Sequence, residues 1–188
     1  LFRSDQNLMT EWHVRYGGRG VMIYWHVDKK ALCVYSQLKT CSSSEIVAMI
    51  EGVIHHATDA EVKKNYVDSH GQSLVAFAFS NLLNFDLLPR LKLIGPEKLY
   101  LDSLANNGSY KNIENIMTRV IDWSLIANYY DQIIQYATAL RNKTAEPEAL
   151  LKRFTSNAVK HPVYLALQEL GRVIKTVFIC RYLMSEEL

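Results

Sequence analysis

The sequence predicts an α/β fold with a mixed sheet, flanking helices and a largely helical C-terminal half. Two observations support this prediction. In the first half of the chain, short β-rich runs alternate with helical patterns, and from about Trp123 onward apolar residues recur at helical spacing. The chain has 188 residues, of which 49% are hydrophobic and 21% charged, so it is long and apolar enough to bury one sizeable core.

Strands and helices alternate in the first half. The expected elements are strands over 21–27 and 31–38, a helix from Glu45 to about Ala57, a strand over 66–68, a helix over 74–83 and a strand over 85–88. The first two strands form an antiparallel hairpin, because only a short connection separates them. Ser42 and Glu45 match a capping box, in which both side chains satisfy free amide groups at a helix start.

The second half becomes helical after an irregular middle. Residues 90–113 have the least regular pattern in the chain. After the helix that begins near Trp123, Glu146-Pro147 opens a short helix that runs through Phe154. His161-Pro162 starts the last helix, which is expected to run through Tyr182.

Composition excludes several classes of protein. The net charge of +2 is too small to indicate nucleic-acid binding by itself. Three widely spaced cysteines form no zinc pattern and favour a reducing cytosol, and no apolar run is long enough to span a membrane. Because the sequence lacks a start methionine and stops within a helical pattern, we expect it to be a fragment of a longer chain.

Asp68 is the first candidate functional residue. It stands at the end of a short strand and is followed closely by Gly71 and a helix. An acid at the carboxyl end of a sheet strand lies where α/β folds bind ligands. The alternative interpretation is a residue that caps the next helix or a turn.

Glu169 is the second candidate. It lies on the last helix, whose expected buried stripe consists of Leu167, Leu170, Val173, Ile174, Val177 and Phe178. Glu169, Arg172 and Thr176 form a second, polar face. Taken alone, this pattern favours a solvated face that carries an intrahelical Glu–Arg pair.

Several segments, taken together, resemble the catalytic region of Tn3-family transposases. In the first half they are Thr10–Val21, Tyr24–Val27, Ser42–Glu45 and Met49–Gly52. In the remainder they are Tyr66–Ser73, Phe85–Arg90, Glu169–Arg172 and Lys175–Leu183. The most specific are Asp-Ser-His-Gly-Gln-Ser from Asp68 and Glu-Leu-Gly-Arg from Glu169, and the stretches occur in the family's order over nearly the whole chain.

The resemblance implies a DDE triad of acids on an RNase H-like fold. Asp68 matches the second aspartate and Glu169 the final glutamate, whereas the first aspartate is expected a few residues before Leu1. Asp5 is closest in sequence but matches a different position of the family. The implied organisation is an RNase H-like part over about 1–95, a helical insertion over about 96–155 and a catalytic helix over about 161–183.

The family's chemistry is strand cleavage and strand transfer at transposon ends, with Mg²⁺ or Mn²⁺ as cofactor. Carboxylate oxygens suit these ions, and two ions can activate the attacking group and stabilise the leaving oxygen. We therefore expect Asp68 and Glu169 to be both catalytic residues and metal ligands. The expected partners are transposon-end and target DNA and a second copy of the full-length protein, acting in the bacterial cytoplasm at the nucleoid, without a membrane.

Five basic residues are hypothetical DNA contacts: His70, Arg90, Lys92, Arg172 and Lys175. Arg172 lies one helical turn from Glu169 and could hold a phosphate that is not cut. Two alternative functions stay open. One is an RNase H-like nuclease without strand transfer, and the other is a non-catalytic DNA-binding or assembly module, which applies if the fragment acts without the first acid.

Overall fold

The computed structural model describes residues 2–3, 8–14, 16–56, 61–103, 110–154 and 161–185, so Asp5 lies outside the described residues. The strands are β1 (Phe2–Arg3), β2 (Glu11–His13), β3 (Gly18–Val27), β4 (Cys33–Lys39), β5 (Lys64–Val67), β6 (Asp86–Pro89), β7 (Leu99–Leu101) and β8 (Met117–Val120). The helices are α1 (Glu45–His55), α2 (Leu74–Leu82), α3 (Trp123–Arg141), α4 (Pro147–Leu151) and α5 (Pro162–Met184), with 3₁₀ turns η1 (Ser69–Gly71), η3 (Glu114–Ile116) and η4 (Lys152–Phe154).

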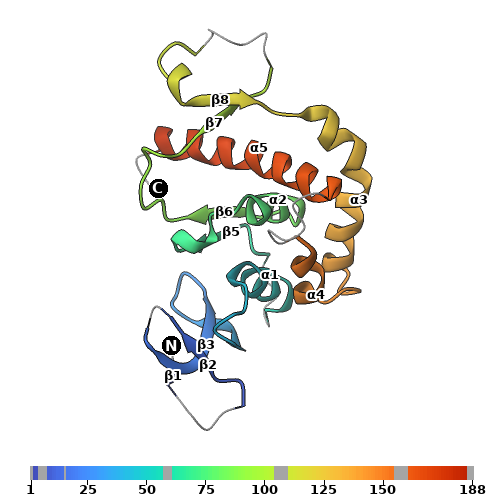
Figure 1. Ribbon diagram of the computed structural model, residues 1–188. Coiled ribbons are helices and arrows are strands. Elements are labelled where there is room, and N and C mark those ends of the chain that lie inside the picture. The colour runs from blue at the N-terminus through green and yellow to red at the C-terminus, as the bar shows by residue number, and fades with distance from the viewer. Residues whose placement is uncertain are drawn as a thin grey trace.

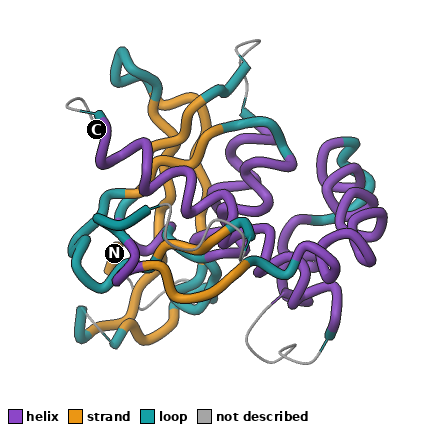
Figure 2. The backbone as a smooth tube through the Cα atoms, turned by 90° about the horizontal axis from the view of Figure 1, so that it is seen from above, coloured by secondary structure: helices purple, strands orange, loops and turns teal. Residues whose placement is uncertain are grey.

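Helix α5 runs through the middle of the molecule (Figure 1). The β7–β8 pair lies on one side of α5, and α2 with the β5–β6 pair lies on the other. Helix α1 and then the β3–β4 hairpin follow beyond β5–β6, so the N-terminal strands form one end of the molecule. Seen from above, most strands gather on one side and a group of helices on the opposite side (Figure 2). No helix among the described residues is long and apolar enough to cross a membrane.

The expected mixed sheet is not found among the described residues, because antiparallel and parallel pairs occur there in separate sheets. Strands β1, β2 and β4 all pair antiparallel with β3. Strands β5 and β6 form a parallel pair, and β7 and β8 form another. The α/β class and the helical C-terminal half are confirmed.

The hairpin predicted from the β-rich runs packs on α1 through a polar contact. Gln37 Nε2 donates a hydrogen bond to the Ala48 carbonyl at 2.6 Å, and His26 Nε2 lies 3.1 Å from the same oxygen. The His26 ring occupies the space beside Gly52, where a Cβ would come within 1.8 Å of Nε2. Burial lowers the pKa of His26, so this ring packs in its neutral form.

The predicted capping box is wrong. Helix α1 has Ser44 as its N-cap, without a side-chain cap hydrogen bond, so Glu45 is the first helical residue and not the third. The hydroxyls of Ser42 and Ser43 instead lie 3.2 and 2.9 Å from Thr40 Oγ1. Ser42 and Ser43 therefore belong to the turn that connects β4 to α1, and not to the start of the helix as the pattern predicted.

Helices α2 and α5 form the centre of the core. Phe77 of α2 is fully buried, and its ring lies 5.4 Å from that of Phe178 on α5. The two helices approach so closely that a Cβ on Gly171 would lie 2.1 Å from the Leu74 carbonyl oxygen. Glycine is the residue that permits this approach, because every other side chain begins with a Cβ.

The second half begins as the helical spacing predicts, because α3 starts at Trp123. The Asp122 carboxylate caps α3 by accepting a hydrogen bond from the Leu125 amide at 2.9 Å. Strands β7 and β8 were not predicted, since each is only three or four residues long and lies in or beside the irregular segment. Val177 was expected in the buried stripe of α5 but is 43% exposed, because it faces a surface cavity.

The contact at Gly171 yields a stability prediction. We expect Gly171→Ala to lower the free energy of unfolding by about 1–3 kcal/mol, because the new methyl group meets backbone and not a side chain that can move aside. Chemical denaturation of the purified protein measures this. Gly95→Ala is the matched control, since nothing lies within 4 Å of its Cβ position. Equal effects of the two substitutions would contradict the close packing.

Candidate active site

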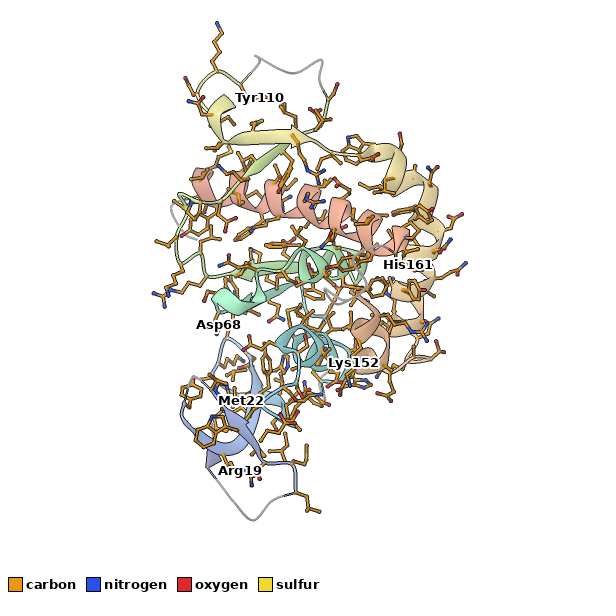
Figure 3. All side chains as sticks on the ribbon, viewed as in Figure 1. Arg19, Met22, Asp68, Tyr110, Lys152 and His161 are labelled. Carbon is orange, nitrogen blue, oxygen red and sulfur yellow. The ribbon has the colours of Figure 1, made fainter. Side chains whose placement is uncertain are left out.

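Asp68 follows β5 directly and is exposed. Its carbonyl accepts a hydrogen bond from the Gly71 amide at 3.2 Å, which closes the turn η1. The cap of α2 is a different residue, Ser73, whose hydroxyl accepts from the Ala76 amide at 3.0 Å. Asp68 is therefore not the N-cap of this helix, and Figure 3 shows it at the end of β5 that faces the N-terminal sheet.

The charge of Asp68 affects the pKa of Tyr24, a residue of β3. Burial, together with the nearby carboxylates of Glu45 and Asp68, raises the pKa of Tyr24 to about 12. Two acids from separate elements thus act on one phenol, which stays protonated at neutral pH. The charges at the end of β5 and at the start of α1 are therefore close enough to Tyr24, in the middle of β3, to affect its ionisation.

Glu169 is buried, with only 4% of its surface exposed. Its Oε1 accepts hydrogen bonds from the guanidinium of Arg119 on β8 and, at 2.6 Å, from that of Arg172 one turn along α5. The Asp122 amide lies 3.4 Å from Oε2. The predicted intrahelical pair of Glu169 with Arg172 is confirmed. The prediction that this face of α5 is solvated is wrong, because β7, β8 and the start of α3 cover it.

The two guanidiniums share a second neighbour. The Cζ atoms of Arg119 and Arg172 each lie 5.8 Å from the ring centre of Tyr100 on β7. The aromatic face is electron-rich, so it attracts both cations. We call these four residues, Tyr100, Arg119, Glu169 and Arg172, the carboxylate–arginine cluster.

Arg119 and Tyr100 were not predicted as site residues from the sequence. Arg119 is 50 residues from Glu169 in the chain and lies on a short strand without a clear pattern. Only the parallel pairing of β7 with β8, in which Tyr100 is opposite Arg119, brings the two residues to α5. No residue spacing in the sequence signals this contact.

Asp68 and Glu169 have different surroundings. Gly171 faces α2, and residues two apart on a helix point to nearly opposite sides, so Glu169 faces away from α2. The charge of Asp68 helps to raise the pKa of Tyr24, whereas Glu169 forms ion pairs with Arg119 and Arg172. Among the described residues, no group of three or more histidine, cysteine, aspartate or glutamate side chains could hold a metal ion.

The arrangement of these acids therefore does not fit a divalent metal. Carboxylate oxygens are suitable donors, but Glu169 Oε1 is taken by two cations and the side chain is almost fully enclosed. A metal ion at Oε1 would have to replace a guanidinium. The structure thus holds Glu169 in an ion-pair cluster.

The other predicted basic residues lie in different settings. Arg90 is exposed and stands beside the Asp68 turn, since its amide donates to the Val67 carbonyl at 2.9 Å. Lys92 is exposed two residues further on. Lys175 is largely enclosed and pairs with Glu97 at 2.6 Å. The side chain of His70 lies outside the described residues.

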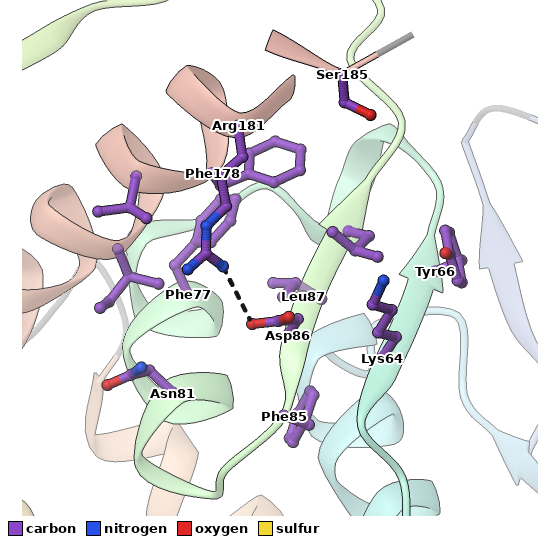
Figure 4. Close-up of a pocket in the computed structure, with 13 residues that line it drawn as sticks. Lys64, Tyr66, Phe77, Asn81, Phe85, Asp86, Leu87, Phe178, Arg181 and Ser185 are labelled. Atoms are coloured by element: carbon purple, nitrogen blue, oxygen red, sulfur yellow. Dashed lines mark ion pairs between the residues drawn. The ribbon is translucent and has the colours of Figure 1, made fainter. Parts of the chain in front are cut away.

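Two cavities among the described residues lie away from these side chains. One of about 330 Å³ opens between the β5–β6 pair and helices α2 and α5, with Asp86 and Arg181 3.9 Å apart beside it (Figure 4). Another, of about 500 Å³, is lined by the serines before α1 and by residues of α4 and η4. None of the predicted site residues lines either cavity.

The fold and the site define an α/β protein with a strand-end aspartate and a buried carboxylate–arginine cluster. Residues 2–188 match the Tn3 transposase DDE domain. The chain belongs to this family.

Three relatives illustrate the relationship. Over 97% of this chain, the transposase of transposon Tn1546 from Enterococcus faecium is 26% identical, and that of IS1071 in transposon Tn5271 from Comamonas testosteroni is 28% identical. The transposase of Tn21 from Escherichia coli is 24% identical over 100% of this chain. The match covers only 18% or 19% of these relatives, so the chain spans about a fifth of their length. No solved structure shows a significant match to this chain.

The environment of Tyr24 yields a prediction of pH dependence. Because the pKa of Tyr24 is raised from 10.0 to about 12 in the folded protein, its contribution to stability is complete below pH 10 and is lost as the pH rises through 12. Denaturation at a series of alkaline pH values should show a steeper loss of stability in the wild type than in Tyr24→Phe. Identical slopes would show that Tyr24 is not protected from ionisation.

Proposed function

We propose that this chain is the catalytic region of a DNA transposase that cleaves strands at transposon ends and joins them to target DNA in the presence of Mg²⁺ or Mn²⁺. The observation that carries the proposal is the buried carboxylate of Glu169 among guanidiniums, in a chain that belongs to a DDE transposase family. Burying a carboxylate costs desolvation free energy, and a solvated glutamate on the helix surface would avoid that cost. Enclosed carboxylates held by charge-assisted hydrogen bonds occur at functional sites, and the family match supports that interpretation for Glu169.

Asp68 and Glu169 are the two proposed catalytic acids and metal ligands within this chain. Each carboxylate supplies oxygen donors of the kind that magnesium prefers. Because their surroundings differ in this structure, a centre that uses both acids would require the carboxylate–arginine cluster to open and the two acids to come closer together.

The remaining acid of the triad, its first aspartate, is proposed to precede Leu1 on a strand of an RNase H-like sheet. Strand β1 pairs antiparallel with β3, with Phe2 opposite Val21. Cys41 Sγ lies 3.6 Å from the Glu11 carbonyl, which places β4 and β2 along the same edge of β3 and leaves β1 on the other edge. If the chain before β1 continued in the direction of β1, it would run along β3 past Tyr24. Tyr24 is the residue whose pKa the charge of Asp68 helps to raise.

The proposed organisation keeps an RNase H-like part over about 1–95, an insertion over about 96–155 and a catalytic helix over about 161–183. The insertion contains β7 and β8 as well as helices α3 and α4. Its strands cover the face of α5 that carries Glu169. This part of the chain therefore covers Glu169, the final acid of the proposed triad.

DNA is the proposed partner. Arg90 and Lys92 are exposed on the segment beside the Asp68 turn and are suited to phosphate contacts there. His70, which belongs to that turn, is proposed as a further DNA contact. Arg172, which is part of the carboxylate–arginine cluster, would contact a DNA phosphate. Lys175 would reach one only if its pair with Glu97 opened. The full-length protein is proposed to act as a homodimer at the bacterial nucleoid.

Strand transfer by the full-length protein tests this function. We expect Asp68→Ala and Glu169→Ala each to lower metal-dependent cleavage and joining of a transposon-end DNA by about 100-fold or more, because each removes a charged group from the reacting centre. Asp131→Ala is the matched control, since Asp131 is exposed on α3. Gel analysis of cleaved and joined strands measures both steps.

The outcomes separate the alternatives. Cleavage without joining in the wild type would indicate an RNase H-like nuclease. Full activity in both alanine variants would show that the acids are wrongly assigned and would favour a DNA-binding or assembly module.

A further inference from the structure

The outer face of the β3–β4 hairpin is apolar and exposed. Side chains alternate between the two faces of a strand, and His26 packs against α1, so Trp25 points to the opposite face. Trp25 is 64% exposed there. Its neighbours on this face are also exposed, namely Ile23 and Val27 on β3 and, opposite Ile23 on β4, Leu38. A contiguous apolar surface of this kind marks a binding site.

A second exposed indole extends this surface along the sheet. Trp12 of β2 is 62% exposed and lies opposite Arg19 of β3, so the two side chains point to the same side of the sheet. Arg19 is exposed and precedes Trp25 by an even number of residues, which keeps both on one face. At about 3.3 Å per residue, the two indoles are separated by roughly 20 Å along β3. Figure 3 shows Arg19 farther along this sheet from Asp68 than Met22.

The charges around this surface favour an anionic partner. Lys29 and Lys30 are exposed in the turn at one end of the hairpin, and Arg19 is exposed toward the other end of β3. Strands β2, β3 and β4 contain a single acid, Glu11, whose carboxylate accepts a hydrogen bond from a backbone amide before α1 at 2.8 Å. Asp28 accepts hydrogen bonds from two amides of its own turn at 2.8 and 2.9 Å. Both acids are thus engaged with the backbone, and the cations are left to attract a polyanion.

Unpaired DNA fits this combination of indoles and cations. Bases of any sequence stack on exposed aromatic rings, while a basic surface attracts the backbone phosphates. Duplex DNA would meet the cations but keeps its bases stacked on one another. A protein partner would cover the apolar side chains but would need acids placed at both ends of the sheet. A span of roughly 20 Å suits a site of about four nucleotides.

We infer that the sheet face that carries Trp25 and Trp12 binds an unpaired stretch of DNA by base stacking. Each indole stacks on one base, and the exposed cations at the two ends bind phosphates. The surface lies on the side of β3 opposite to Tyr24, whose pKa the charge of Asp68 helps to raise. It therefore holds a strand away from the proposed catalytic acids. This inference rests on DNA being the partner, as proposed above, but it depends neither on metal nor on the two acids.

Binding of a labelled oligothymidine to the full-length protein, followed by fluorescence anisotropy, tests this site. We expect Trp25→Ala to weaken binding about tenfold, because one stacked base loses its partner. Trp25→Leu should weaken it as much, whereas Trp25→Phe should cost about threefold or less, since only phenylalanine keeps an aromatic ring. Tyr130→Ala is the matched control, because Tyr130 is a 45% exposed aromatic residue on α3. This control should leave the affinity unchanged, and a blunt duplex of the same length should bind equally to the wild type and to Trp25→Ala.

Salt dependence gives a second readout. Replacing Lys29 and Lys30 together by glutamine should lower the slope of log affinity against log salt for oligothymidine by about 1.4, because each contact with a single strand contributes about 0.7. Lys143→Gln is the control, since Lys143 is an exposed lysine after α3. Circular dichroism checks that each variant is folded, and Trp25→Leu replaces Trp25→Ala if the latter is not.

The outcomes decide between the possible partners. Weaker oligothymidine binding in Trp25→Ala and Trp25→Leu, with duplex binding intact, supports the site. No binding by the wild type, or equal binding by Trp25→Ala, would overturn it, and an altered oligomeric state of Trp25→Ala in light scattering would then assign this face to a protein partner.

Failure of this inference differs from failure of the proposed function. If Asp68→Ala and Glu169→Ala lose strand transfer while Trp25→Ala binds oligothymidine like the wild type, the stacking site is wrong and the transposase function stands. If the two acid variants keep full strand transfer while the Trp25 variants lose oligothymidine binding, the acids are wrongly assigned and the stacking site stands.

Discussion

The packing of α5 on α2 is the contact on which the rest of the structure depends. At Gly171 the backbones of the two helices come so close that a side chain would not fit. This approach buries the aromatic residues Phe77 and Phe178 against each other and fixes the rotation of α5. Once that rotation is set, the face that carries Glu169 has to point away from α2, and the elements after β6 have to cover it.

Covering that face creates an electrostatic requirement. A carboxylate that loses its water needs charged hydrogen-bond partners, and Arg172 alone leaves the second side of the cluster open. Strands β7 and β8 supply Tyr100 and Arg119, and the two guanidiniums then share both the carboxylate and the aromatic ring. The same contacts attach a short and otherwise weakly held strand pair to the central helix. The contacts that hold β7 and β8 to α5 are therefore the same contacts that enclose Glu169.

Much of the fold could be predicted from local patterns. The β3–β4 hairpin, the start of α3 at Trp123 and the last helix all follow from residue periodicity and from turn or cap residues. The errors occur where local signals compete. Ser42 matched a cap, but its hydroxyl lies beside Thr40 Oγ1 in the preceding turn. Strands β7 and β8 escaped notice because such short strands gain their stability from a partner and from α5, neither of which a local pattern reveals.

The sequence by itself determined the family, the two candidate acids and the order of the long helices and of strands β3 to β6, because these depend on residue identity and on spacing along the chain. Tertiary structure alone decided that Glu169 is buried, that Arg119 holds it and that Asp68 belongs to a different neighbourhood around Tyr24. The reason is physical. The state of a carboxylate is set by the charges and the water within a few ångströms of it, and those neighbours come from segments that are remote in sequence and are brought together only by packing.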